Sequence, residues 1–244
     1  MPLLRVLTYN IHGGRGADRR LDLARIAGVI AESDADIVAL QEVDARRPRS
    51  GGVDQAAWLA DQLGMHAQFG PTIERGDEAY GIATLTRLPI FESRQVCLPW
   101  RESNPRSEPR CALLTRIAWP VRERALDMVN THLSVRFGER ADQVATLIDD
   151  LMNDEIDAPI IVAGDFNCTP WSRPYRTLRG RLQCAASPRS WPAALPVVPL
   201  DHILFCGALR VVRSGVVHAR GARLASDHAP VLAELEAFAT EVAA

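Results

Sequence analysis

Short apolar stretches, each of a length typical of one β-strand, recur along the whole chain and constrain its fold most strongly. Strands are expected at residues 3–9, 36–43, 80–86, 90–97, 111–119, 125–133, 160–163, 201–205, 209–217 and 229–235. Apolar residues at helical spacing predict helices at residues 21–30, 56–63 and 141–151. Strands outnumber helices, and short turns join many neighbours, such as 80–86 and 90–97, expected to pair across Leu88-Pro89. The pattern predicts a layered α/β sandwich, with two sheets face to face and helices outside.

The remaining segments are expected to be loops. Residues 46–52 and 99–109 are polar and rich in turn formers, and residues 172–199 are interrupted by prolines, so that this last stretch is expected to be irregular. The chain contains no linker, low-complexity tract or clear repeat. One domain is therefore expected over residues 1–244.

The charge balance limits the classes of partner. The 244 residues carry a formal net charge of -2, with a sequence pI of about 6.3. Proteins that coat nucleic acid without sequence preference are clearly basic, because they neutralise phosphates. Nucleic acid is therefore a possible partner that the composition does not favour. All 28 basic residues are Arg, which excludes Lys as a Schiff-base or phosphate-binding residue.

Cysteine usage and hydropathy bear on the compartment. The five cysteines form no CxxC pair, so neither a structural zinc site nor a redox motif is indicated. The first residues contain no long apolar segment typical of a signal peptide, and no window approaches a membrane span. Reduced thiols in a cytoplasmic protein are the expectation.

Polar residues stand where several of the predicted strands end. A site on a rigid scaffold is commonly built in this way, because strand ends bring distant residues to one rim. Each residue alone has an ordinary explanation as a turn residue, a surface strand end, a core histidine or a capped turn. Their recurrence indicates a shared site. The residues are Asn10, Glu42, His132, Asp165 with Asn167, Asp201 with His202, and Asp227 with His228.

Six stretches in a fixed order carry a family resemblance. They are LTYNIHGG, LQEVD, NTHLS, GDFN, LDHILF and SDHAPV, from residue 7 to residue 231. With them the chain resembles the endonuclease/exonuclease/phosphatase superfamily, and most closely its small bacterial members, some of them encoded beside cardiolipin-synthesis genes. The resemblance implies a four-layer α/β sandwich with two mixed β-sheets, a divalent cation and hydrolysis of a phosphoester.

The resemblance also implies roles at the metal and the attacking water. Glu42 corresponds to the principal metal ligand, with Asn10 nearby, and Asp227 to a direct or water-mediated metal contact. Asp165 corresponds to the residue that polarises the attacking water, and Asn167 orients around it. Mg²⁺ is the expected cofactor and Mn²⁺ a plausible substitute, because a hard cation that keeps several waters needs only one or two carboxylates.

Further roles concern the phosphate itself. The resemblance implies that His228 hydrogen-bonds the scissile phosphate, that Asp201 pairs with His228 and fixes its orientation, and that His132 stabilises the phosphate or assists the leaving oxygen. These roles agree with phosphoryl transfer, which depends on positioning and charge neutralisation more than on covalent catalysis.

The chain departs from the family pattern at several positions. His12 stands where the DNA-repair members typically have Asp, and it is expected to line the substrate pocket. Ile82 stands at the Asn position of a segment that usually reads YGNAxLSR. Arg110 is the candidate for binding the substrate phosphate, although an ordinary surface Arg explains it nearly as well, and Cys111 follows it where Gly is usual.

Three functions follow from these observations. The first is a metal-dependent phosphoesterase that acts on a small or lipid-derived phosphodiester or phosphomonoester by direct attack of water. The second is a DNase or abasic-site endonuclease of the same superfamily, which needs a basic surface for DNA. The third is a non-catalytic binding protein, which is disfavoured because Glu42, Asp165 and His228 are all present.

Overall fold

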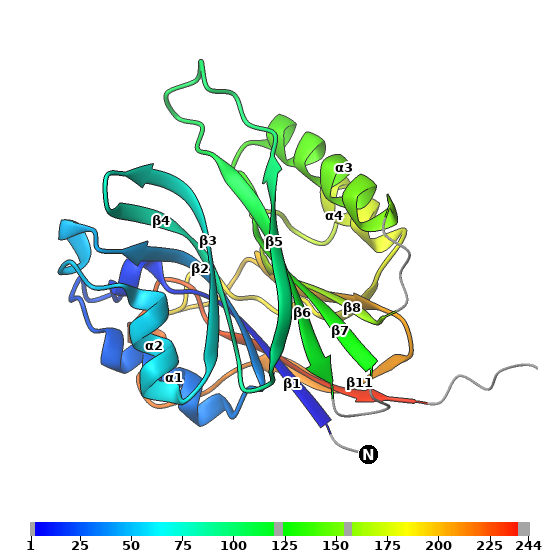
Figure 1. Ribbon diagram of the computed structural model, residues 1–244, viewed down its shortest axis with the longest axis horizontal. Helices are drawn as coiled ribbons and strands as arrows, with labels where there is room; N and C mark the ends of the chain where they lie inside the picture. Colours follow the sequence, from blue (N-terminus) through cyan, green and yellow to red (C-terminus); the bar gives the residue numbers. More distant parts are fainter. Residues whose placement is uncertain (1–2, 120–123, 154–157, 239–244) are drawn as a thin grey trace, which may run out of the picture.

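Two six-stranded sheets pack face to face in the computed structural model, which describes residues 3–119, 124–153 and 158–238 (Figure 1). The first sheet has the order β11 (Leu209–Val216), β12 (Val231–Ala237), β1 (Leu3–Asn10), β2 (Ile37–Ala45), β4 (Glu78–Thr86) and β3 (His66–Arg75). The second has the order β5 (Ile90–Leu98), β6 (Arg110–Trp119), β7 (Arg124–His132), β8 (Ile160–Asp165), β10 (Asp201–Cys206) and β9 (Gln183–Ala186). Both sheets are mixed, since β1–β2 and β7–β8 are parallel and the other pairs antiparallel.

Helices cover the outer face of each sheet. On the first sheet lie α1 (Leu23–Ser33) and α2 (Gln55–Leu63), and on the second lie α3 (Phe137–Asn153) and α4 (Arg173–Arg179). The shorter pieces η1 (His12–Gly14), η2 (Pro48–Ser50) and α5 (Ala222–Ala225) sit in connections. The expected four-layer α/β sandwich is thereby confirmed. No helix in these described ranges is both long and apolar enough to cross a membrane.

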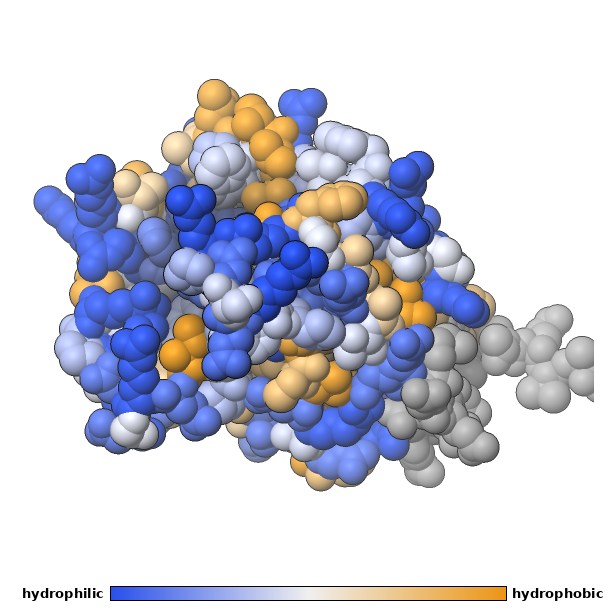
Figure 2. All heavy atoms as spheres, turned by 90° about the horizontal axis from the view of Figure 1, so that it is seen from above, coloured by the Kyte–Doolittle hydropathy of each residue, from blue (hydrophilic) through white to orange (hydrophobic). Residues whose placement is uncertain are grey.

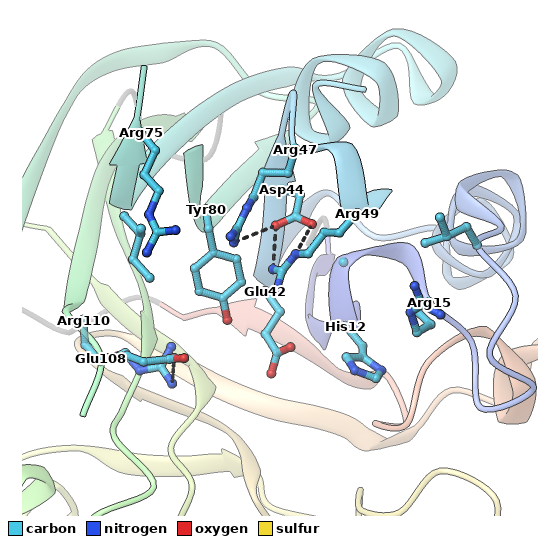
Figure 3. A pocket seen from close by; sticks show the side chains of 13 residues that line it. His12, Arg15, Glu42, Asp44, Arg47, Arg49, Arg75, Tyr80, Glu108 and Arg110 are labelled. Atoms are coloured by element: carbon cyan, nitrogen blue, oxygen red, sulfur yellow. Dashed lines mark hydrogen bonds and ion pairs between the residues drawn. The ribbon is translucent and has the colours of Figure 1, made fainter. Parts of the chain in front are cut away.

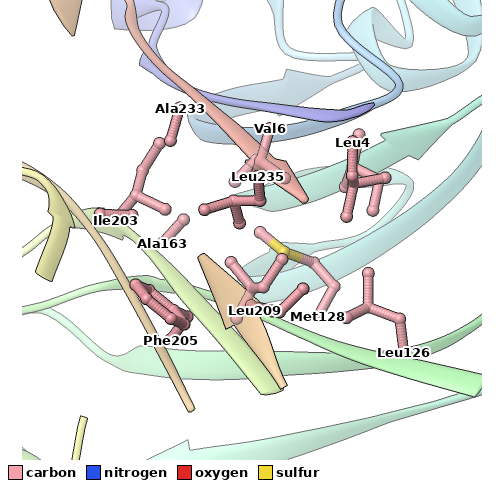
Figure 4. Packing of buried hydrophobic residues seen from close by; sticks show 14 of the residues in the cluster. Leu4, Val6, Leu126, Met128, Ala163, Ile203, Phe205, Leu209, Ala233 and Leu235 are labelled. Atoms are coloured by element: carbon pink, nitrogen blue, oxygen red, sulfur yellow. The ribbon is translucent and has the colours of Figure 1, made fainter. Parts of the chain in front are cut away.

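The core occupies three separate layers because most strands are buried on both faces. In β8, Ile161 and Ala163 face the layer between the sheets, shown in Figure 4, while Ile160 and Val162 pack beneath α3 and α4. A strand covered on both faces has no polar face, which explains its continuous apolar sequence. Polar side chains inside such strands need partners there, and Gln41 of β2 donates hydrogen bonds to Thr8 of β1 and Asn130 of β7.

The expected pairing of residues 80–86 with 90–97 is wrong. These residues form β4 and β5, which belong to different sheets, and the chain crosses between the sheets at Leu88-Pro89. Leu88 packs against the core between the sheets, and the Pro89 carbonyl accepts a hydrogen bond from the Ala118 amide. The segment is thus a crossover anchored by an apolar side chain.

The strand β4 pairs on one side with β2 and on the other with β3, a strand that the sequence pattern did not predict. β3 contains Gly70 and Pro71 and is only partly buried, so it lacks a clear apolar alternation. Proline is tolerated in a strand at the edge of a sheet, and β3 is such an edge.

The stretch expected to be irregular, 172–199, contains one short helix and one short strand. The helix α4 has seven residues, begins after the cap Ser172 and carries Pro174 in its first turn. A helix of this length is too short to show a 3.6-residue periodicity. β9 has four residues and pairs with the edge of β10.

Gly164 is required by the close contact between β7 and β8. A Cβ atom at this position would lie 1.8 Å from the carbonyl oxygen of Thr131. We expect Gly164→Ala to lower the free energy of unfolding by about 3 kcal/mol or more, because backbone cannot move aside as a side chain can. The control is Gly28→Ala in α1, where the added Cβ meets nothing within 4 Å. This variant should be more stable by about 0.5–1 kcal/mol. Urea unfolding measures both, and equal effects would contradict the prediction.

Candidate active site

Three polar residues lie side by side at one rim of the second sheet. Asp165 ends β8, and its register partners are His132 at the end of parallel β7 and Asp201 at the start of antiparallel β10. All three are buried. Sheet hydrogen bonding therefore sets the spacing of these groups, and they need no loop to hold them in place.

The first sheet contributes Asn10 from the end of β1. Its side-chain amide donates to Asp165 Oδ2 at 3.1 Å and to Glu42 Oε1 at 2.9 Å. The Asn10 carbonyl accepts from the Ser226 hydroxyl at 2.7 Å, which fixes the segment before β12. One amide thus bridges two carboxylates that come from different sheets.

His228 lies between two carboxylates. Its Nδ1 is 2.9 Å from Asp201 Oδ2, and its Nε2 is 3.7 Å from Asp165 Oδ2. Burial by itself would lower the pKa of His228, but the charges of Asp201 and Asp165 and the hydrogen bond to Asp201 outweigh burial and raise it. His228 is therefore an imidazolium at neutral pH, with Nδ1–H donating to Asp201 and Nε2–H facing the site. One ligand atom from each of Asp165, Asp201 and His228 lies within 4.8 Å of the others.

Burial also raises the pKa of the Asp165 carboxyl group. The His228 charge opposes this rise, as do hydrogen bonds from the Asn167 backbone amide (2.9 Å to Oδ1) and the Asn10 side chain. A carboxylate with a raised pKa is a stronger base than an exposed one, which suits it to accept a proton from water.

His132 is held in the neutral state. Burial, the Arg110 guanidinium and His228 keep the pKa of His132 well below its usual range. An N–H of Arg110 lies 3.2 Å from His132 Nδ1, and since a guanidinium only donates, Nδ1 accepts and the ring proton is on Nε2. Nε2–H then points toward Asp165 Oδ2, 3.5 Å away. Asn167 Nδ2 lies 3.1 Å from His132 Nε2. It donates its hydrogen bond to the Leu133 carbonyl at 3.0 Å.

Three of the predicted site residues adopt left-handed backbone conformations. The φ angles are 49° for His12, 56° for Glu42 and 49° for Asn167. Non-glycine residues adopt this region uncommonly, and it is retained where surrounding structure imposes it, often at functional sites. Glu42 lies inside β2 at a shift in the β2–β4 register, two residues further from the strand end than the sequence indicated.

A pocket of about 430 Å³ opens beside this group of residues. His12, Glu42 and Arg110 line it, and Figure 3 shows Tyr80 between Arg110 and Glu42. Viewed from the side of the β3–β4 turn and the β5–β6 loop, the molecule is covered largely by hydrophilic residues (Figure 2). The pocket lies next to the buried group, since Glu42 in its wall accepts from the same Asn10 amide that donates to Asp165.

The structure brings most of the predicted residues together, with two qualifications. Asp227 is half-exposed, and its Oδ1 lies 3.5 Å from His12 Nδ1 at the rim. His202 is structural: its ring nitrogens are 2.7 Å from the Ser187 hydroxyl and the Cys168 carbonyl, and burial lowers its pKa to about 4.

Sequence reasoning missed part of the pocket wall. The sequence predicts only a polar loop for residues 46–52, yet Arg47 and Arg49 line the pocket and lie over the Tyr80 ring. The signal available was the buried acid Asp44 in an apolar strand, which requires a cationic partner nearby.

Comparison with known proteins assigns the family. Residues 7–228 match the sequence model of the Endonuclease/Exonuclease/phosphatase family. The chain belongs to this family. It is 30% identical over 253 residues to YbhP, an uncharacterized protein of Escherichia coli (strain K12), with 95% of each chain covered.

Solved structures of the Endonuclease/Exonuclease/phosphatase family share the fold. A family protein from Beutenbergia cavernae superposes with a TM-score of 0.79 at 25% identity, over 100% of this chain and 74% of that one. The mannosyl-6-phosphatase of Bacteroides thetaiotaomicron superposes with a TM-score of 0.75 at 20% identity, over 96% of this chain and 99% of that one.

Two departures from the family pattern are physically linked. Ile82 and Cys111, which stand where Asn and Gly are usual, belong to one small buried cluster with Leu113. The two side chains thus pack together in one cluster between β4 and β6, and neither lines the pocket.

The charge of His228 makes stability depend on pH. Its pKa is raised to about 10 in the folded protein from 6.5, so its stabilising contribution is complete below pH 6.5 and is lost as pH rises toward 10. We expect the difference in unfolding free energy between wild type and His228→Gln to fall by about 1 kcal/mol per pH unit from pH 7 to 10.

His202→Gln is the matched control. Its pKa is lowered, so its titration lies below pH 6.5 and the corresponding difference should stay constant from pH 7 to 10. Denaturant unfolding at each pH gives both differences. A pH-independent difference for His228→Gln would refute the charged state assigned to this side chain.

Proposed function

We propose that the protein is a divalent-cation-dependent phosphoesterase that hydrolyses a small or lipid-derived phosphodiester or phosphomonoester by direct attack of water. The observation that carries the proposal is the surroundings of Asp165. The buried Asp165 carboxylate accepts hydrogen bonds from the Asn10 side-chain amide and the Asn167 backbone N–H. It also faces the N–H groups of His132 and His228. This arrangement combines a base with donors for developing negative charge.

The residues beside Asp165 suit a hard cation. Glu42 and Asn10 offer oxygen atoms, and Glu42 lines the open pocket, where a cation could keep several of its waters. Within the described ranges, the Asn10 amide is the hydrogen-bond partner found for the Glu42 carboxylate, which leaves its other oxygen available. Mg²⁺ bound there would neutralise phosphate charge and lower the pKa of a bound water. Family membership supports the same requirement.

The chain's own groups then divide the remaining work. Asp165 orients the attacking water and accepts its proton. His228 donates Nε2–H to a phosphate oxygen, and Asp201, whose buried Oδ2 accepts from Nδ1, keeps that ring charged and oriented. His132 donates Nε2–H to the phosphate or to the leaving oxygen, and Arg110 fixes the tautomer that allows this.

Substrate and compartment are also proposals. The protein of the same fold that is named a mannosyl-6-phosphatase supports a sugar-sized phosphomonoester as the substrate here. The net charge of -2 does not favour DNA. A reducing cytoplasm is supported by five cysteines that are all free.

Replacing Asp165 tests the site. We expect Asp165→Asn to lower kcat by at least about 10²-fold, because the amide cannot accept the proton of the attacking water. The matched control is Asp127→Asn, which breaks a partly buried pair with Arg116 in β6, outside the rim and the pocket, and should leave kcat unchanged. Near-normal turnover by Asp165→Asn would refute the role of this carboxylate.

A hydrolysis assay with several phosphoesters identifies the class of substrate. It contains bis-p-nitrophenyl phosphate, p-nitrophenyl phosphate, supercoiled plasmid, an abasic duplex and phospholipid vesicles, each with Mg²⁺ and with Mn²⁺. Turnover of small or lipid esters without nicking of plasmid supports the proposal. Plasmid or abasic-site cleavage that is lost in Asp165→Asn would instead assign the nuclease function.

Chelation tests the cation. Exhaustive treatment with EDTA should abolish hydrolysis, and added Mg²⁺ or Mn²⁺ should restore it, because the cation neutralises the phosphate charge. In Glu42→Gln the cation concentration for half-maximal activity should rise about tenfold or more, since one charged oxygen ligand is lost. Full activity after chelation would exclude the proposed dependence.

A further inference from the structure

The pocket beside Glu42 contains more positive charge than its acids neutralise. Its walls carry five guanidinium groups and three carboxylates. One of the carboxylates, Glu42, is assigned above to the cation. The guanidiniums belong to Arg15, Arg47, Arg49, Arg75 and Arg110, and the other two carboxylates to Asp44 and Glu108 (Figure 3).

Asp44 holds two of these arginines at once. Its carboxylate, fully buried in β2, accepts from Arg49 Nε at 2.8 Å and from Arg49 NH2 at 2.7 Å, and Arg47 NH1 lies 3.6 Å away. Both guanidiniums stack on the Tyr80 ring, with centroid distances of 5.2 Å and 5.8 Å. The single charge of Asp44 neutralises one of the two guanidiniums, so one positive charge remains. Stacking on Tyr80 fixes the position of both guanidiniums before any ligand binds.

Two further arginines have no carboxylate within ion-pair distance in the part of the chain that the structure describes. They are Arg75, at the end of β3, and Arg15, whose NH1 donates to the Arg19 carbonyl at 3.2 Å. Arg110, by contrast, is paired with Glu108 at 3.1 Å. The pocket therefore presents about three uncompensated guanidiniums in addition to the cation proposed at Glu42.

We propose that this pocket binds a second phosphate group, carried by a small substrate whose scissile phosphate lies at Asp165 and His228. The inference rests on the proposed phosphoesterase function and defines its substrate class as a compound with two phosphates. Guanidinium forks match phosphate oxygens, and several of them in one pocket favour a dianion over a neutral group. A volume of about 430 Å³ suits a small molecule and not a duplex.

Three six-carbon probes test the second anion. Glucose 6-phosphate carries one phosphate, 6-phosphogluconate adds a carboxylate, and glucose 1,6-bisphosphate adds a second phosphate. We expect kcat/KM for the bisphosphate to exceed that for glucose 6-phosphate by about tenfold or more, as expected from one charge-assisted contact. Equal values for the two would overturn the proposal, and an equal preference for 6-phosphogluconate would overturn the assignment to phosphate.

Variants on opposite edges of the first sheet locate the contact. Arg75→Gln, on β3, should reduce the preference for the bisphosphate about tenfold, and Arg15→Gln should act in the same direction. The matched control is Arg213→Gln on β11, the opposite edge strand, which should leave the preference unchanged. Arg49 is left intact because its loss would leave Asp44 buried without its main partner. Equal effects of Arg75→Gln and Arg213→Gln would refute the site.

Binding separates this inference from the phosphoesterase proposal. Calorimetry with Asp165→Asn, without turnover, should show glucose 1,6-bisphosphate binding about tenfold more tightly than glucose 6-phosphate, and Arg75→Gln in this background should remove the difference. If wild type hydrolyses nothing but this difference is present, the enzyme proposal fails and the second-phosphate site stands. If wild type hydrolyses substrates but the two compounds bind equally tightly, the enzyme proposal stands and the second-phosphate site fails. Cleavage of cardiolipin in vesicles, but not of the soluble bisphosphate, would place both phosphates on a lipid.

Discussion

The packing of two sheets face to face is the constraint on which the rest of this structure depends. Strands covered by a second sheet on one side and by helices on the other have no solvated face, so their polar residues lie at the rims or hydrogen-bond within the core, as Gln41 and Asn130 do. The ends of β1, β7 and β8 and the start of β10 meet at one such rim, and the Asn10 amide joins the carboxylates there. Side chains at the ends of these strands are held in place by the hydrogen bonding of both sheets.

Burying two carboxylates beside each other is unfavourable unless charge is supplied. In this rim the compensation comes from the His228 imidazolium, which lies between Asp201 and Asp165, and from neutral donors around Asp165. The same environment raises the pKa of Asp165 and keeps His132 neutral, so that a base, a charged donor and a neutral donor coexist within one hydrogen-bonded group. Distinct protonation states of neighbouring groups are what acid–base chemistry on a phosphate requires.

The pocket depends on a different interaction, the ion pair between buried Asp44 and Arg49. It ties the turn after β2 to the sheet and directs two guanidiniums over Tyr80. The catalytic rim and the pocket are thus built separately, the rim by sheet register and the pocket by a side-chain ion pair. This separation would allow related chains to keep the chemistry while changing the group that the pocket recognises.

Local sequence by itself determined the two-sheet sandwich and most residues of the rim, because apolar runs that end in polar residues reflect burial on both faces. The tertiary structure alone decided which strands are neighbours. It placed β4 and β5 in different sheets, with Leu88 packed against the core between the sheets, and it paired β4 with β3 as well as with β2. It also decided the protonation of His132 and His228 and brought Arg47, Arg49 and Arg75 into one pocket. These properties depend on charges and partners distant in sequence, and no local pattern encodes them.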